Sequence, residues 1–294
     1  MPHDNDIDAS LLRRWQLPVP DSGDKNTRGS IFIVAGSAAM PGAAVLAATA
    51  ALRAGAGKLS VGTSASSAPL VAAAIVEALV VPLRETAFAA LALSEARGIA
   101  ERANGTDALV IGPGMTGKLG SSALLRATLP ALRVPVVLDA IALGALRTRP
   151  TLLAHLEGRA VLTPHAGEMA SLLGCERDAV ESDPATHARD VAQRMRAVVV
   201  LKGGTTYVAA PDGVLYRHRH GVTGLATSGS GDVLAGIIGG LLARGVPPLA
   251  AAVWGVYIHA QAGLALSRSI GMGFLAHELL PHVPVVMRAV GDSA

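Results

Sequence analysis

Short apolar runs alternate with alanine-rich stretches along most of the chain, and Gly or Pro bounds most of the runs. Continuous apolar runs are typical of strands that are buried on both faces, and the alanine-rich stretches suit helices that cover such strands. The predicted strands lie at 31–35, 58–62, 78–81, 107–112, 134–139, 159–163 and 197–203. This alternation predicts an α/β fold with a mostly parallel central sheet and helices on both faces.

Two patterns near the end of the chain differ from this alternation. Residues 205–218 predict a β-hairpin that turns at Asp212 and Gly213, since Asp-Gly is a preferred two-residue hairpin turn. Residues 231–268 predict two strongly apolar helices joined at "RGVPP". No linker or repeat divides the chain. We therefore expect one domain over residues 25–288, preceded by an N-terminal extension over residues 1–24.

Polar and glycine-rich segments follow the predicted strands. They read "AGSAAMPGAA", "GPGM", "DA", "TPHAGE" and "KGGTT", and "SGSGD" precedes the first apolar helix. The carboxyl ends of parallel strands share one edge of a sheet, and ligands of α/β proteins bind along that edge. We expect these segments to line one pocket.

Composition and charge narrow the classes of partner. With 51% hydrophobic and 16% charged residues the chain can bury a large core, and a net charge of +3 without basic runs disfavours a nucleic-acid surface. Cys175 is the only cysteine, which excludes an intrachain disulfide. The N-terminus lacks a signal-peptide pattern, and Arg244, Pro247 and Pro248 interrupt the most apolar stretch, 233–258. We expect a cytoplasmic protein that binds neither nucleic acid nor membrane.

The segment "TSGSGDVLAG", residues 227–236, combines a glycine-rich turn with the start of an apolar helix. Three glycines inside that helix, Gly236, Gly239 and Gly240, each cost about 1 kcal/mol relative to alanine. They are reasonable where another backbone or a ligand passes close by. The free N–H groups of the turn and the helix dipole together favour an anion.

Asp232 follows this turn, and its carboxylate has two interpretations. It caps the helix, or it is a general base aimed at a hydroxyl that attacks a phosphate held by the neighbouring amides. The chain has no G-x-x-x-x-G-K-[ST] motif and no G-x-G-x-x-G after the first strand. These absences disfavour P-loop chemistry and ordinary Rossmann NAD chemistry.

Six segments together resemble one known family. They read "GSIFIVAGSAAMPGAAVLAATAALRAGAG", "DALVIGPGM", "VVLDA", "VLTPHAGEMASLLG", "VVVLKGGTTYVAAPDG" and "HGVTGLATSGSGDVLAGIIGGLLARG". In the same order they resemble segments of the ADP/ATP-dependent NAD(P)H-hydrate dehydratases, which belong to the ribokinase-like superfamily. The resemblance covers roughly residues 25–285. It implies a ribokinase-like fold and dehydration of the S-epimer of hydrated NADH or NADPH, with ADP or ATP and Mg²⁺.

The resemblance also implies roles for individual residues. Asp232 is the expected catalytic base and a contact of the hydrated cofactor. The other expected contacts of the hydrated cofactor are Ala43, Gly114 and His165, and those of the nucleotide are Lys202, Gly203, Gly204, Thr205, Thr206 and Gly231. For Ala43, Gly114 and His165 a purely structural role is the alternative, and His259 reads as a core hydrogen-bonding residue. The family further implies a homo-oligomer, a tetramer.

One position departs from the family pattern. Members usually carry a second acid in the segment that here reads "LDAIAL", where this chain has Ile141 and retains Asp139. We assign no metal ligand from the sequence. A cation at this rim would rely on Asp139 and Glu168, with nucleotide oxygens and water.

Two other functions stay open at this point. A ribokinase-like kinase of a small vitamin precursor, of the hydroxymethylpyrimidine or hydroxyethylthiazole type, would share the "GSGD" segment and the aspartate. A nucleotide-binding regulatory protein without catalysis would share the fold, and the retention of Asp232 argues against it.

Overall fold

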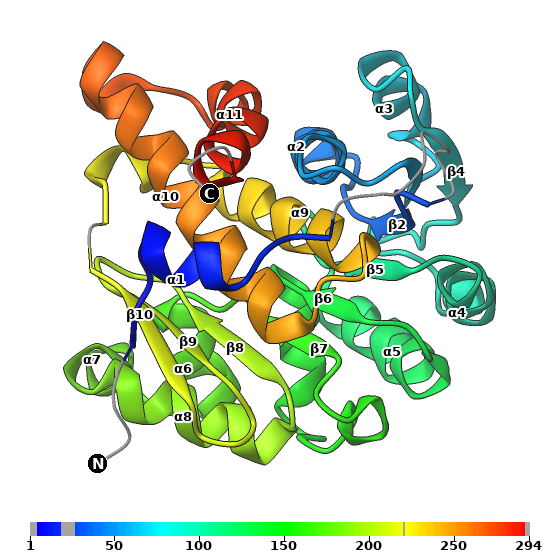
Figure 1. Ribbon diagram of the computed structural model, residues 1–294. Coiled ribbons are helices and arrows are strands. Elements are labelled where there is room, and N and C mark those ends of the chain that lie inside the picture. Colours follow the sequence, from blue (N-terminus) through cyan, green and yellow to red (C-terminus); the bar gives the residue numbers. More distant parts are fainter. Residues whose placement is uncertain (1–4, 19–26, 220, 292–294) are drawn as a thin grey trace.

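The computed structural model describes residues 5–18, 27–219 and 221–291, so residues 1–4 and 19–24 of the expected N-terminal extension lie outside the described part. Within that part, ten strands form one sheet in the order β1-β10-β9-β8-β7-β6-β5-β2-β3-β4 (Figure 1). The strands are β1 Asn5–Asp6, β2 Ser30–Val34, β3 Lys58–Ser64, β4 Leu79–Leu83, β5 Ala108–Ile111, β6 Val136–Leu138, β7 Ala160–Leu162, β8 Val198–Leu201, β9 Thr206–Ala209 and β10 Leu215–His218.

Most neighbouring strands are parallel, as the sequence predicts. Every pairing from β8 across to β4 is parallel, whereas β9 is antiparallel to both β8 and β10. The predicted hairpin is confirmed, with Leu215 opposite Ala209 and the Val214 N–H donating to the Asp212 carboxylate at 3.1 Å.

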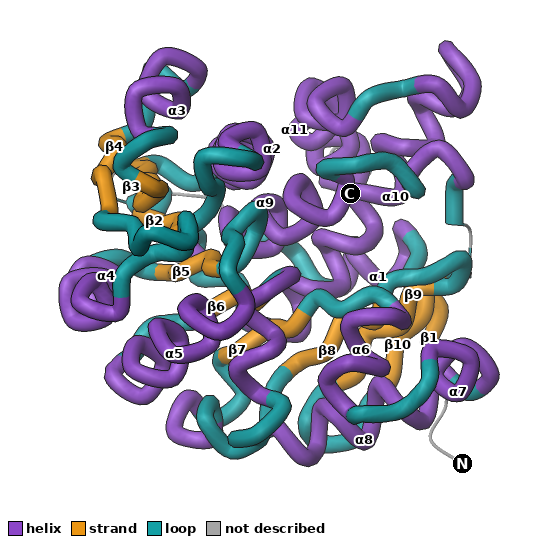
Figure 2. The backbone as a smooth tube through the Cα atoms, turned by 180° about the vertical axis from the view of Figure 1, so that it is seen from behind, coloured by secondary structure: helices purple, strands orange, loops and turns teal. Residues whose placement is uncertain are grey.

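Helices cover both faces of the sheet (Figures 1 and 2). They are α1 Ala9–Arg14, α2 Pro41–Arg53, α3 Ala68–Ala74, α4 Ala96–Asn104, α5 Lys118–Thr128, α6 Ala166–Leu173, α7 Arg177–Ser182, α8 Pro184–Met195, α9 Ser230–Ala243, α10 Pro248–Ile270 and α11 Leu279–Gly291. Alternate residues of a strand enter different cores: Ile31 and Ile33 pack with α2, α9 and α10, while Phe32 and Val34 pack with α4, α5 and α8. The strands are apolar throughout because both faces are covered.

The glycines of α9 bring it into close contact with α2. A Cβ added at Gly236 would overlap the carbonyl oxygen of Ala47, and one added at Gly240 would overlap that of Ala51. The predicted backbone approach is therefore confirmed at Gly236 and Gly240, with α2 as the partner, whereas Gly239 faces the side chains of Val110 and Ile31. This packing aligns the two helices so that Leu46 of α2 lies against Gly229, at the start of α9.

The second apolar helix, α10, packs against α9, α11 and the sheet. Within the described ranges, Pro248–Gly273 is the one helical segment that is long and apolar enough to cross a membrane, and 61% of its most apolar window is buried inside the protein. Such burial is typical of a core helix.

Residues 5–14 form a strand and a helix that no pattern in the sequence predicts. Strand β1 pairs with β10 in parallel, with Asp6 opposite Arg217. Helix α1 follows; Asp8 caps it by accepting the Leu11 N–H at 2.8 Å, and the Leu11 and Leu12 side chains enter the core. The start of the chain thus completes one edge of the sheet.

The order of the strands creates a switch point between β2 and β5. From β2 the chain moves outward to β3 and β4, then returns to pair β5 with the other side of β2. Loops that leave two such strands diverge, which opens a crevice at their carboxyl ends. The predicted ligand-binding loops lie along this edge.

Candidate functional site

Lys202 follows β8 and is placed beside His165 by an extension of the sheet. The Lys202 N–H donates to the Pro164 carbonyl at 2.8 Å, and a parallel bridge pairs His165 with Lys202 beyond the ends of β7 and β8. The loops that carry His165 and Lys202, which are distant in the sequence, are thereby held side by side.

Two acids approach the ammonium of Lys202. Its Nζ lies 3.2 Å from Asp139 Oδ1 and 3.8 Å from Glu168 Oε2. Asp139 is buried and also accepts the hydroxyl of Thr163 at 2.6 Å. Burial alone lowers the pKa of Lys202, but Asp139 and Glu168 outweigh it and the pKa is raised above its ordinary value. Lys202 is therefore a fixed positive charge, and it is the cation that faces Asp139 in the structure.

His165 and Glu168 form the N-terminal cap of α6. His165 Nδ1 accepts the N–H groups of Gly167 and Glu168 at 3.0 and 3.2 Å, while Glu168 Oε2 accepts the His165 N–H at 2.9 Å. Because Nδ1 accepts, a neutral ring carries its proton on Nε2. Nε2 lies 3.6 Å from Glu168 Oε1, and more than half of the side chain is exposed, at 59%.

The start of α9 lies next to Lys202. Gly229 is the N-cap residue with a left-handed φ of +88°, and no side chain caps the helix. A Cβ added at Gly231 would lie 3.3 Å from Lys202 Nζ. The uncapped N-terminus of α9 and the Lys202 ammonium thus lie close together, and both favour the binding of an anion there.

Asp232 lies in the first turn of α9, within the field of these groups. Burial and then the charge of Asp139 raise the pKa of Asp232, Lys202 lowers it, Glu168 raises it, and the result is about 7. A carboxylate with this pKa both holds and releases a proton near neutral pH, which is what a general base requires.

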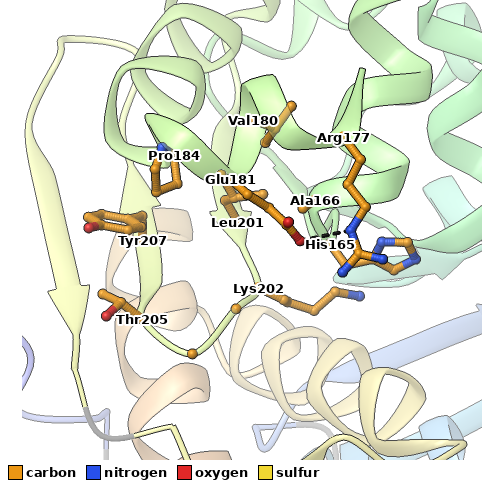
Figure 3. A pocket seen from close by; sticks show the side chains of 12 residues that line it. His165, Ala166, Arg177, Val180, Glu181, Pro184, Leu201, Lys202, Thr205 and Tyr207 are labelled. Carbon is orange, nitrogen blue, oxygen red and sulfur yellow. Dashed lines mark hydrogen bonds and ion pairs between the residues drawn. The ribbon is translucent and has the colours of Figure 1, made fainter. Parts of the chain in front are cut away.

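Two cavities meet at the predicted nucleotide loop. One of about 720 Å³ lies toward α7 and β9, and Figure 3 shows the side chains that line it. The other, of about 580 Å³, lies toward the start of α9 and the middle of α10 and includes Gly231 and Thr206. The residues common to both are His165, Arg177, Lys202, Gly203 and Gly204, and Thr205 lines the first cavity alone.

Ala43 and Gly114 lie together but apart from this loop. A Cβ added at Gly114 would overlap the Ala43 side chain, and Gly114 has a left-handed φ of +61°. Neither residue is among those described as lining the two cavities. The structure therefore places His165 with the nucleotide loop, while Ala43, in α2, and Gly114 lie against each other.

His259 of α10 forms hydrogen bonds with the start of α9. Its Nε2 lies 2.9 Å from Ser230 Oγ and 3.0 Å from the Ser230 carbonyl. Burial lowers the pKa of His259 to about 4, against the raising effect of the Ser230 backbone. The neutral ring thus fixes Ser230, in keeping with the predicted hydrogen-bonding role.

Ile141 packs against the hydrophobic core on the α4–α8 face, so a hydrophobic side chain suits its place in the fold. Among the described residues, no group of three His, Cys, Asp or Glu side chains could hold a metal ion. A divalent cation at this rim would depend on ligands that arrive with it.

Comparisons with known proteins show which family the chain belongs to. The model of the NAD(P)H-hydrate dehydratase family matches residues 31–284. The chain belongs to this family. A Xanthomonas campestris ADP-dependent (S)-NAD(P)H-hydrate dehydratase is 49% identical over 96% of this chain and 95% of its own.

Solved structures of NAD(P)H-hydrate dehydratases share the fold as well. That of the Bacillus subtilis enzyme, co-crystallised with ATP/Mg²⁺, has a TM-score of 0.83 and 31% identity, covering 99% of this chain and all of the other. A hydroxyethylthiazole kinase from Pyrococcus horikoshii has a TM-score of 0.59 and 18% identity over 98% of this chain and 96% of its own, which shows the shared ribokinase-like fold alone. The vitamin-kinase alternative is thus the more distant one.

Proposed function

We propose that this protein dehydrates the S-epimer of hydrated NADH and NADPH, restoring the reduced cofactors, with ADP or ATP as co-substrate. The observation that carries the proposal is the position of Asp232: a carboxylate of pKa about 7 beside an uncapped helix end and the Lys202 ammonium. Such a site suits proton removal from a hydroxyl next to a bound phosphate. The family membership of the chain supports the same reaction.

The reaction has a clear physical logic. Hydroxide is a poor leaving group, and a phosphate ester is a good one. Asp232 takes the proton of the ring hydroxyl as the hydroxyl oxygen attacks the terminal phosphorus of the nucleotide. The bond between that phosphorus and the bridging oxygen of the nucleotide then breaks. The ring nitrogen then assists cleavage of the ring C–O bond, which releases phosphate, and loss of a proton from the neighbouring ring carbon to solvent completes the double bond. The amides of Gly229–Gly231 and the Lys202 charge stabilise the transferring group.

Roles for the other residues follow from their places around Asp232. Lys202, Gly203, Gly204, Thr205, Thr206 and Gly231 bind the nucleotide, since they border the two cavities next to the α9 N-terminus. Ala43 and Gly114 receive the hydrated cofactor from the α2 side, and His165 contacts it from the side of α6 through Nε2. Residues 25–288 form the catalytic domain.

The charges of the site fit a magnesium ion that arrives with the nucleotide. Asp139 is buried and bound by Thr163 and Lys202. Glu168 caps α6 through Oε2 but is partly exposed, so it is the more accessible acid and would hold the ion together with phosphate oxygens and water. When bound, the ion neutralises phosphate charge.

The surface supports self-association. Three large apolar side chains are exposed at this end of the sheet: Leu79 of the edge strand β4, Leu70 of the neighbouring α3, and Val76 between the two elements. An apolar sheet edge is commonly covered by a partner. We propose a cytoplasmic homo-oligomer, a tetramer, and its mass by light scattering tests the assembly.

The test of the function is direct. The purified protein is mixed with hydrated NADH or NADPH and ADP or ATP, with Mg²⁺, and the reduced-nicotinamide absorbance is followed. We expect nucleotide-dependent recovery of that absorbance, and recovery reduced by about 10²–10⁴ in Asp232→Asn. Wild-type protein that gives no recovery with either nucleotide would overturn the proposal.

A further inference from the structure

Arg177 is a second positive group at the junction of the two cavities. It is the first residue of α7, and it lines both cavities together with Lys202, Gly203 and Gly204. Figure 3 shows its side chain reaching from α7 toward the His165 ring, on the side of the cavity where Lys202 enters. Nothing in the sequence pattern singled it out, because α7 is short and Arg177 follows no predicted strand.

The other cation at this junction, Lys202, already has acidic partners. Lys202 Nζ is held by the buried Asp139 at 3.2 Å and faces the partly exposed Glu168 at 3.8 Å, so these two acids offset much of its charge. A nucleotide phosphate chain entering here brings more negative charge with every phosphate. The site therefore needs a cation whose charge is not consumed by a buried partner.

Arg177 meets that requirement. Its Nε donates to Glu181 Oε1 at 2.7 Å, in an i,i+4 pair whose side chains are 69% and 47% exposed. An exposed pair of this kind contributes little stability, so Arg177 can exchange Glu181 for another anion at low cost. Glu181 lines only the larger cavity, whereas Arg177 also faces the one that contains Gly231 at the start of α9. A phosphate near the start of α9 thus lies in a cavity that Arg177 lines and Glu181 does not.

We propose that Arg177 leaves Glu181 when a nucleotide binds and forms hydrogen bonds with the outer phosphates of its chain. The guanidinium donors match phosphate oxygens in pairs, which an ammonium cannot do. The inference rests on the proposed function, because it takes the ligand to be ADP or ATP. On this proposal Arg177 makes the affinity of the site depend on the number of phosphates in the nucleotide.

The test is calorimetric titration of AMP, ADP and ATP, with Mg²⁺, into wild type and Arg177→Gln. We expect Arg177→Gln to leave the Kd for AMP within about twofold, to raise that for ADP several-fold, and to raise that for ATP about tenfold or more. Arg177→Lys should recover only part of the loss. Glu181→Gln releases Arg177 and should lower the Kd for ATP.

Arg97→Gln is the matched control. Arg97 forms the same i,i+4 pair with Glu101, also at 2.7 Å, on α4 and away from both cavities, so its loss should leave all three affinities unchanged. If the wild type binds ADP and ATP while Arg177→Gln and Arg177→Lys bind them equally well, the inference is wrong and the proposed function stands. An equal loss for all three nucleotides also overturns it. If the wild type binds no nucleotide, both fail.

Discussion

The pH dependence of the reaction should follow the ionisation of Asp232. The pKa of this carboxyl is raised to about 7, first by burial and then by Asp139, so the active, deprotonated form is lost as the pH falls through 7. At about pH 7 half of the carboxyl is deprotonated, and at about pH 6 roughly a tenth is. We therefore expect kcat/KM to fall about fivefold from pH 7 to 6 and to rise about twofold from pH 7 to 8.

Asp139→Asn is the perturbation that tests the cause. Its charge raises the pKa of Asp232, so removing it should move the midpoint of the profile to lower pH. Initial rates of absorbance recovery, measured at low hydrated NADH, saturating ADP and constant ionic strength, give both profiles, and Asp232→Asn supplies the baseline. A wild-type profile that is flat between pH 6 and 8, or a midpoint that does not move in Asp139→Asn, would refute the reasoning.

Three further predictions concern binding and stability. Lys202→Ala should weaken nucleotide binding more than binding of the hydrated cofactor, and His165→Ala should do the reverse; titrations of both ligands that show equal effects would contradict this assignment. Gly236→Ala should lower the free energy of unfolding by about 1–3 kcal/mol because a Cβ there overlaps α2. Gly98→Ala, in α4 with open space around it, should be neutral or stabilising by up to about 1 kcal/mol, and urea unfolding compares the two. His259 has a pKa lowered to about 4 from 6.5, so the unfolded chain takes up a proton first. The His259 contribution to stability should fall by on the order of 3 kcal/mol from about pH 6.5 to 4. Asp232, whose pKa is raised to about 7, contributes in the opposite direction over this range, so the difference between wild type and His259→Phe in acid unfolding curves isolates the His259 contribution.

The sequence predicted the elements whose signal is local. The apolar runs identified the parallel strands, Asp212 and Gly213 identified the hairpin, and Gly236 correctly predicted a close backbone approach. Strand β1 was missed because two residues carry no period of their own, and its partner Arg217 is far along the chain.

The missed part of the candidate site is its charge network. Asp139 and Lys202 are 63 residues apart, and their pairing depends on the adjacency of β6, β7 and β8, which no local pattern encodes. Arg177 was missed for the same reason, because only the folding of α7 against the nucleotide loop places it at the cavities. Single residues with a glycine-rich or strand-end context could be predicted, whereas pairs between distant loops could not.

The central claim is that the ring hydroxyl itself receives the phosphoryl group, with Asp232 as its base. Hydrated NADH whose ring hydroxyl carries oxygen-18 tests this most directly, in ordinary water with ADP and the wild-type protein. Phosphoryl transfer followed by elimination breaks the ring C–O bond and leaves the labelled oxygen on phosphorus. The account predicts one labelled oxygen in the inorganic phosphate for each NADH formed. Unlabelled phosphate, with the label released as water, would contradict it.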